Sequence, residues 1–110
     1  MGKHYLLEIY GTDPLLLMEL EGFMSFIRPG LEECMATVLA ESSHKFPGAQ
    51  AGYTYLALLS TSHFSIHTWP EKSCAAIDMF SCGEILSDVL VRDVLQYFAP
   101  ESYSLKMINR

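Results

Sequence analysis

The chain has 110 residues, half of them hydrophobic, and a formal net charge of −6 from 13 acidic and 7 basic side chains. This length and composition predict one compact domain, residues 1–110, and exclude a disordered chain. Lysines and arginines do not cluster, as phosphate recognition requires, so nucleic acid is excluded as a main partner.

The cysteines and the N-terminus predict a cytoplasmic protein. Cys34, Cys74 and Cys82 are an odd number of cysteines without a Cys-x-x-Cys pair, which indicates a reducing compartment. The start "MGKHYLLEIYGTD" lacks the apolar region of a signal peptide. No run reaches the roughly 18 apolar residues of a membrane span, so we expect no membrane partner.

In the first half of the chain, apolar alternation predicts a strand over residues 3–11. Leucines and aromatic residues at spacings of three and four predict a helix over residues 14–28, capped by Thr12 or Asp13. Pro29 and Gly30 are expected to break or kink it, with a further helical turn afterwards. Residues 36–43 are then predicted to form a strand.

The second half is dominated by predicted strands. Proline and glycine indicate a loop over residues 44–52. The elements expected after it are strands 53–60, 63–69 and 73–83, a helix over 84–99 ended by Pro100, and a closing strand over 102–110. Helices near both ends of a run of strands predict an α+β fold: a two-layer α/β sandwich with helices on one face of a mainly antiparallel sheet.

The stretch "TSHFSIHTWPE", residues 61–71, holds the candidate chemistry. His63 and His67 on one strand would lie roughly 13 Å apart, too far to share one ion, so we expect no metal site. Ser62 lacks the Gly-x-Ser-x-Gly setting of a hydrolase nucleophile. On these residues alone, a half-buried strand with its polar side chains in solvent remains an open alternative.

Longer motifs favour a catalytic role for this stretch. "SHFSIHTWPE" followed by "AAIDMFSCGE", with "HYLLEIYGTDP", "ATVL" and "SHKF" before them, resembles the prokaryotic class of pyruvoyl-dependent S-adenosylmethionine decarboxylase. The resemblance touches most of the chain. It implies a cytoplasmic enzyme of spermidine biosynthesis that works as a homodimer and needs neither a metal nor pyridoxal phosphate.

The resemblance implies that the chain cleaves itself between Thr61 and Ser62, giving pieces 1–61 and 62–110. The Ser62 hydroxyl would attack the Thr61 carbonyl, and elimination and hydrolysis would then convert Ser62 into a pyruvoyl group. His67 matches the family's processing histidine, and an imidazole suits the removal of the Ser62 α-proton. Thr54 matches a hydroxyl residue that supports processing.

The resemblance also implies how the mature enzyme works. The pyruvoyl ketone would form a Schiff base with the amine of S-adenosylmethionine and accept the electrons left when carbon dioxide departs. Cys82 matches the proton donor, Phe46 the aromatic residue that stacks on adenine, and Glu71 the carboxylate that binds the ribose hydroxyls.

Two departures keep alternatives open. Thr61 stands where the family usually has glutamate, and the run from Phe46 to Gly52 is longer than the usual family loop. The same scaffold could therefore decarboxylate ornithine or arginine. A non-catalytic homologue that is never cleaved, and acts as a binding or regulatory subunit, is the alternative outside the enzyme class.

Overall fold

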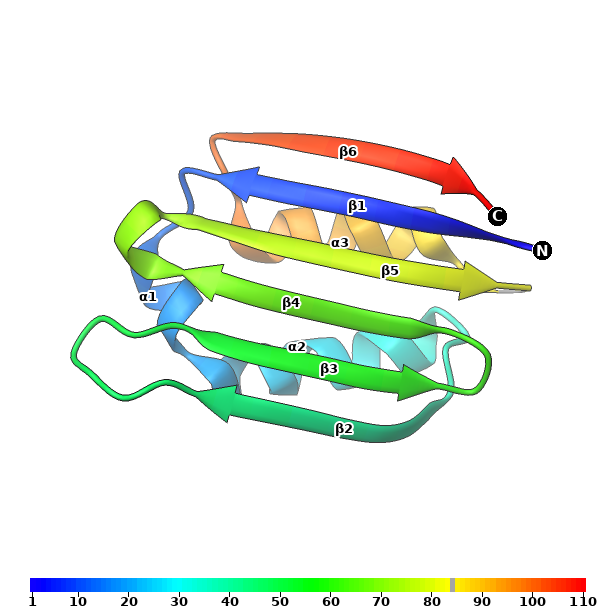
Figure 1. Cartoon of the computed structure of the whole chain (residues 1–110), viewed down its shortest axis with the longest axis horizontal. Helices are drawn as coiled ribbons and strands as arrows, with labels where there is room; N and C mark the ends of the chain where they lie inside the picture. The colour runs from blue at the N-terminus through cyan, green and yellow to red at the C-terminus, as the bar shows by residue number, and fades with distance from the viewer. Residues whose placement is uncertain (84) are drawn as a thin grey trace.

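The computed structural model describes residues 1–83 and 85–110. Its strands are β1 (Gly2–Tyr10), β2 (Val38–Lys45), β3 (Tyr53–Leu59), β4 (His63–Trp69), β5 (Cys74–Cys82) and β6 (Ser102–Asn109). Its helices are α1 (Pro14–Met18), α2 (Leu20–Glu33) and α3 (Ser87–Phe98), with a short 3-10 turn, η1 (Pro70–Lys72), between β4 and β5. Figure 1 shows these elements along the chain.

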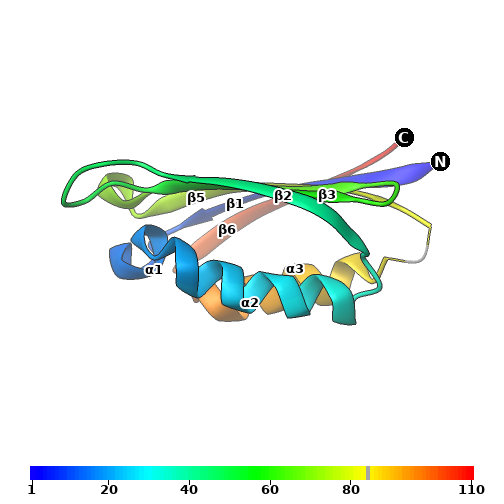
Figure 2. The ribbon, with the colours of Figure 1, turned by 90° about the horizontal axis from the view of Figure 1, so that it is seen from below.

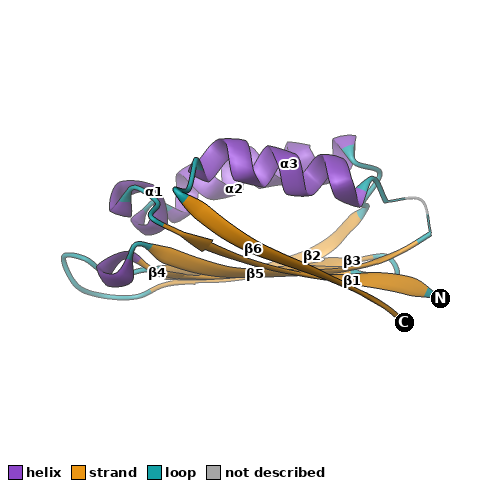
Figure 3. Ribbon diagram, turned by 90° about the horizontal axis from the view of Figure 1, so that it is seen from above, coloured by secondary structure: helices purple, strands orange, loops and turns teal. Residues whose placement is uncertain are grey.

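The strands form one sheet in the order β2-β3-β4-β5-β1-β6 (Figure 1), and every neighbouring pair is antiparallel. All the helices pack on one face of this sheet, so the protein has two layers (Figures 2 and 3). The predicted α+β sandwich is therefore confirmed. None of the described helices is long and apolar enough to cross a membrane.

The core lies between the helices and the sheet. Alternate side chains of the central strands point toward the helices and are buried, including Ile9, Tyr55 and Phe64. Phe23 of α2 lies at the centre, with its ring 5.6 Å from the Phe98 ring of α3. Aromatic contacts at this spacing join both helices to the sheet and fix the layer that supports the opposite face.

The first predicted helix differs from the observed one at both ends of α2. Glu19, with φ −94° and ψ 84°, divides the helical region into α1 and α2, a break that the leucine spacing hid. Of the two outcomes expected at Pro29, a break or a kink, the break does not occur, because α2 continues through Pro29 to Glu33. Its missing N–H removes one hydrogen bond, but buried Ile27 and Leu31 on either side of it anchor the helix to the core.

The loop between β2 and β3 is shorter than predicted, because β2 continues through Lys45. Its far end needs glycine, since a Cβ at Gly52 would lie 2.4 Å from the Thr68 carbonyl oxygen. Helix α3 begins at Ser87, after its predicted start, and the predicted first residue, Glu84, lies outside the described residues.

The sheet face turned away from the helices, called the open face below, carries the remaining alternate side chains of each strand. Strand register places them in rows, such as Leu58, His63, Phe80 and His4. Several large apolar side chains on this face are exposed to solvent: Tyr10, Leu56, Leu58, Trp69 and Ile108.

Candidate active site

Ser62 lies in the tight turn that joins β3 to β4. The Leu59 N–H donates to the Ser62 carbonyl oxygen at 3.0 Å, which closes the turn. The Ser62 side chain is buried, although Thr61 beside it is exposed. The scissile peptide predicted from the sequence therefore sits at a sharp, well-anchored bend.

Cys82, the last residue of β5, lies beside Ser62. Its backbone N–H donates to the Ser62 Oγ at 3.0 Å, and its thiol lies 3.4 Å from the Met1 carbonyl oxygen. The antiparallel pairing of β4 with β5 makes this contact, because β4 begins where β5 ends. A half-buried thiol next to the predicted reactive residue has the chemistry of a proton donor.

Thr54 and His67 face each other on β3 and β4, directly across the strand pair. The Thr54 Oγ1 lies 2.9 Å from the His67 Nδ1, so the hydroxyl fixes the orientation of the imidazole and leaves Nε2 facing outward. Both side chains lie on the open face. This pair can act as an oriented base on a group brought to the open face from outside.

The structure separates these two pairs. His67 lies five positions along β4 from Ser62, and a strand advances about 3.3 Å per residue, so roughly 16 Å separates them. Within one chain, His67 cannot reach the α-proton of Ser62. The predicted site residues therefore form two half-sites, Ser62 with Cys82 at one end of the open face and Thr54 with His67 toward the other.

Phe46 and Glu71 lie at the His67 end. Phe46 is 47% exposed, and its ring packs edge-on to His44 at 4.7 Å. Glu71 is exposed on η1, immediately after Trp69 and Pro70. The Trp69 ring lies 6.4 Å from the His67 ring. Aromatic faces and a free carboxylate suit a ligand with a planar ring and hydroxyl groups.

A polar cluster lies between the two half-sites, near the middle of the open face. Asp78 of β5 receives hydrogen bonds from Ser65 of β4 and pairs with His4 of β1. Burial alone would raise the pKa of the Asp78 carboxyl, but the hydrogen bonds from Ser65 and His4 and the nearby His63 lower it. The carboxylate is therefore kept ionised.

Sequence reasoning missed His44, Trp69, His4 and Asp78 as features of this surface. Strand alternation alone would have placed Asp78 and His4 on one face, since both occupy outward positions among buried residues. Their contact depends on the pairing of β1 with β5, which lie far apart in the sequence. A hollow of about 290 Å³ beside them reaches from Asp78 to His67.

Known proteins match nearly the whole length of the chain. The model of the S-adenosylmethionine decarboxylase family matches residues 3–110. An S-adenosylmethionine decarboxylase proenzyme from Methanococcus maripaludis is 35% identical over 111 residues, covering 100% of this chain and 89% of that protein. An arginine decarboxylase proenzyme from Ignicoccus hospitalis is 36% identical over 84 residues, covering 76% of this chain and 58% of that protein. The crystal structure of the adenosylmethionine decarboxylase from Aquifex aeolicus matches with a TM-score of 0.88 and 25% identity, covering 100% of this chain and 90% of that one.

Proposed function

The chain belongs to the S-adenosylmethionine decarboxylase family, and we propose that it decarboxylates S-adenosylmethionine with a pyruvoyl group made from its own Ser62. The family predicted from the sequence motifs is thereby confirmed. The observation that carries the proposal is the contact between Ser62 and Cys82, two residues from separate motifs that the fold brings together at 3.0 Å.

Processing begins at the turn between β3 and β4. The Ser62 Oγ attacks the Thr61 carbonyl carbon, the peptide C–N bond breaks, and an ester with a free Ser62 amine remains. A base then removes the Ser62 α-proton, the Cβ–Oγ bond breaks, and Thr61 leaves as a carboxylate. Water hydrolyses the resulting dehydroalanine, releasing ammonia and leaving a ketone. The Cys82 N–H supports the first step because it holds the Ser62 Oγ in place.

The base for this elimination is His67, supplied by a second copy of the chain. Within each chain, Ser62 lies before the start of β4 and His67 lies well along it, so the two side chains are too far apart to react. Two open faces packed together, with a two-fold axis through the middle of β4, would set Ser62 of one chain against the partner's His67, and the reverse. The result is a homodimer with two composite sites.

The surface of the open face supports this assembly. Monomeric proteins rarely expose a large contiguous apolar patch. Here five large apolar side chains are exposed on one side of the sheet: Tyr10, Leu56, Leu58, Trp69 and Ile108. A second copy would cover these side chains. The helices already cover the other face, so the open face is the large surface that assembly can bury.

The mature pyruvoyl group supplies an electron sink for the carbanion that decarboxylation leaves. The chain's own residues bind the substrate and return a proton. Phe46 stacks on the adenine, with Trp69 and His44 shaping the same end of the face, and Glu71 binds the ribose hydroxyls. Cys82, next to the reactive residue, protonates the substrate carbon. The product would feed the biosynthesis of spermidine.

A second substrate class has a specific observation in its favour. The Ignicoccus hospitalis relative is an arginine decarboxylase proenzyme at 36% identity. Thr61 and the long run from Phe46 to Gly52 depart from the pattern of the S-adenosylmethionine enzymes. An adenine stacker and a ribose carboxylate have no use with arginine or ornithine, so the presence of Phe46 with Glu71 favours S-adenosylmethionine.

One experiment tests processing and substrate together. The purified protein is followed by intact-mass analysis during incubation, and the processed sample is supplied separately with carboxyl-labelled S-adenosylmethionine, ornithine or arginine. We expect fragments 1–61 and 62–110 and release of carbon dioxide from S-adenosylmethionine. Full-length mass under all conditions would refute the pyruvoyl enzyme and favour a non-catalytic subunit. Activity confined to arginine or ornithine would overturn the substrate alone.

A further inference from the structure

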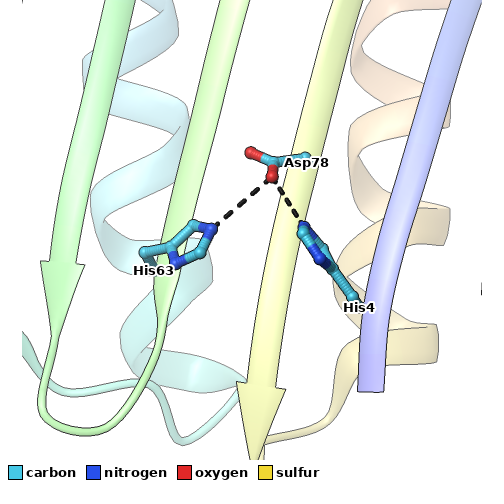
Figure 4. A group of neighbouring side chains, drawn as sticks. All are labelled: His4, His63 and Asp78. Atoms are coloured by element: carbon cyan, nitrogen blue, oxygen red, sulfur yellow. Dashed lines mark hydrogen bonds and ion pairs between the residues drawn. The ribbon is translucent and has the colours of Figure 1, made fainter. Parts of the chain in front are cut away.

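Two histidines and an aspartate converge on the open face from the three central strands β1, β4 and β5 (Figure 4). His4 and His63 flank Phe80 in one row of the sheet, and Asp78 lies two residues before Phe80 on β5. Strands with hydrogen-bonded neighbours on both sides hold these positions. The cluster therefore rests on a rigid part of the fold.

The potential ligand atoms are already close together. The His4 Nε2 lies 2.7 Å from the Asp78 Oδ2, and the His63 Nε2 lies 3.5 Å from the same oxygen. All three atoms lie within 4.8 Å of one another. Tetrahedral zinc, with ligands at about 2.0–2.1 Å, separates its ligand atoms by roughly 3.3–3.5 Å. Small side-chain rotations would reach that geometry.

The remaining Asp78 oxygen is held by a fourth residue. The Ser65 hydroxyl donates a hydrogen bond to the Asp78 Oδ1, which turns Oδ2 toward the histidines. Such outer hydrogen bonds orient the carboxylate ligands of metal sites. The side chains of His4, His63 and Asp78 are 23%, 44% and 29% exposed in the single chain, so an ion can enter before a second copy covers the open face.

We propose that His4, His63 and Asp78 form a binding site for a divalent transition-metal ion such as zinc, with water in the open coordination position. Two imidazoles and one carboxylate favour zinc, cobalt, nickel or copper over magnesium and calcium, which prefer oxygen ligands. Among the described residues this is the single group of three such side chains with the required spacing. All three come from one chain, so the site needs neither the pyruvoyl group nor the dimer.

This site revises the expectation drawn from the sequence. The expected absence of a metal rested on His63 with His67, which strand geometry keeps apart. The fold instead brings His63 to His4, which lies near the N-terminus, and both histidines contact Asp78. The ion would join three strands on the open face, between the two half-sites.

Zinc binding to the metal-stripped, full-length protein tests the proposal by titration calorimetry. We expect one ion per chain, with affinity reduced at least about 100-fold by His4→Gln, His63→Gln or Asp78→Asn, and about 10- to 100-fold by Ser65→Ala. His44→Gln is the matched control, because His44 also lies on the open face but outside the cluster. It should bind zinc like the parent chain.

Cobalt separates this site from binding by cysteine. The electronic spectrum of the cobalt-loaded parent chain should show no thiolate charge-transfer band, because the ligands are nitrogen and oxygen. Imidazole signals of His4 and His63 in the parent chain should shift on zinc addition, a measurement that needs no variant to fold. The proposal is overturned if zinc does not bind, if a His4→Gln/His63→Gln double variant retains it, or if the thiolate band appears.

Discussion

The Cys82 backbone nitrogen lies 3.0 Å from the Ser62 Oγ, although the two residues are 20 positions apart in the sequence. The contact comes from the main chain of Cys82, so the amide and the thiol of one residue can serve different steps. The amide positions the hydroxyl that attacks, and the thiol remains for the substrate carbon. This division makes the two steps separable by substitution.

Cys82→Ala should permit cleavage and slow decarboxylation by roughly 10²- to 10⁴-fold, the usual contribution of a general acid. His67→Ala should instead stop cleavage, because it removes the base for the α-proton. Intact mass over time measures cleavage, and carbon dioxide release from the processed sample measures decarboxylation. Decarboxylation by Cys82→Ala at the parent rate would show that another group donates the proton.

Mixed dimers should reveal whether His67 acts across the interface. Ser62→Ala and His67→Ala chains, each inactive in cleavage alone, are co-expressed with different tags and purified through both. In the mixed dimer, the intact Ser62 belongs to the chain that lacks His67, and the partner's His67 can reach it. We therefore expect cleavage of the His67→Ala chain. An uncleaved mixed dimer would place the base in the same chain or on another residue.

Leu56→Asp should convert the dimer into monomers, because it buries a charge in the proposed interface. Leu105→Asp is the matched control: Leu105 is 42% exposed and Leu56 46%, but register places Leu105 on the helix side of β6. Light scattering across micromolar concentrations gives the molar mass of each. Equal molar masses for the two variants would show that the open face is not the interface.

Glu71→Gln should raise the KM for S-adenosylmethionine by roughly 10- to 100-fold, because a carboxylate that accepts from ribose hydroxyls contributes about 1.5–3 kcal/mol. Steady-state carbon dioxide release provides the measurement. Glu33→Gln removes an exposed acid on α2, away from the open face, and should leave the KM unchanged. Equal KM values for Glu71→Gln and the parent chain would exclude Glu71 from the substrate site.

Tyr55→Phe should lower the free energy of unfolding by about 1.5–3 kcal/mol, because the buried hydroxyl donates to a charged acceptor, the Glu41 Oε2, at 2.7 Å. The Arg28 hydrogen bond lowers the pKa of the Glu41 carboxyl against the effect of burial, and the Tyr55 hydroxyl lowers it further. This contribution is complete above the unfolded-state pKa of about 4.3 and is lost as pH falls through the lower folded-state value.

Urea unfolding between pH 3 and 7 measures this effect, where the Tyr55→Phe curve should depend less on pH than the parent curve. Tyr53→Phe is the control, because its hydroxyl lies 3.5 Å from a neutral acceptor, the Leu16 carbonyl oxygen. We expect a loss below about 1 kcal/mol and an unchanged pH dependence for this variant. A larger loss for Tyr53→Phe than for Tyr55→Phe would contradict the assignment.

Local signals predicted most of the elements. The Asp13 side chain accepts from the Leu15 N–H and caps α1 before Pro14, as the capping pattern indicated. The repeating apolar positions of α3 are buried at Leu90, Val94 and Phe98. Local signals could not show that α2 continues through Pro29, because this depends on how the neighbouring helical turns pack against the sheet.

The sequence motifs named candidate site residues but not how the fold arranges them. The short turn after β3 sets Thr54 opposite His67, which hairpin geometry could have shown. The contact between Ser62 and Cys82 required the register across η1, and the His4 contact required a strand pairing over most of the chain. The distance between Ser62 and His67 was readable from the predicted strand, because its advance of about 3.3 Å per residue already separates His63 from His67.

The strand order has a consequence for the reversibility of unfolding after cleavage. Cleavage after Thr61 would leave β1 on the first piece, inserted between β5 and β6 of the second, so the pieces stay joined by three strand pairings. Unfolding would then become dissociation, and refolding a second-order encounter between two peptides. The melting temperature of the cleaved form would rise more steeply with concentration than that of the uncleaved Ser62→Ala dimer, because its unfolding releases twice as many peptides. Folding must therefore precede the cut, and a cleaved chain that unfolds in dilute solution has lost the unimolecular route back.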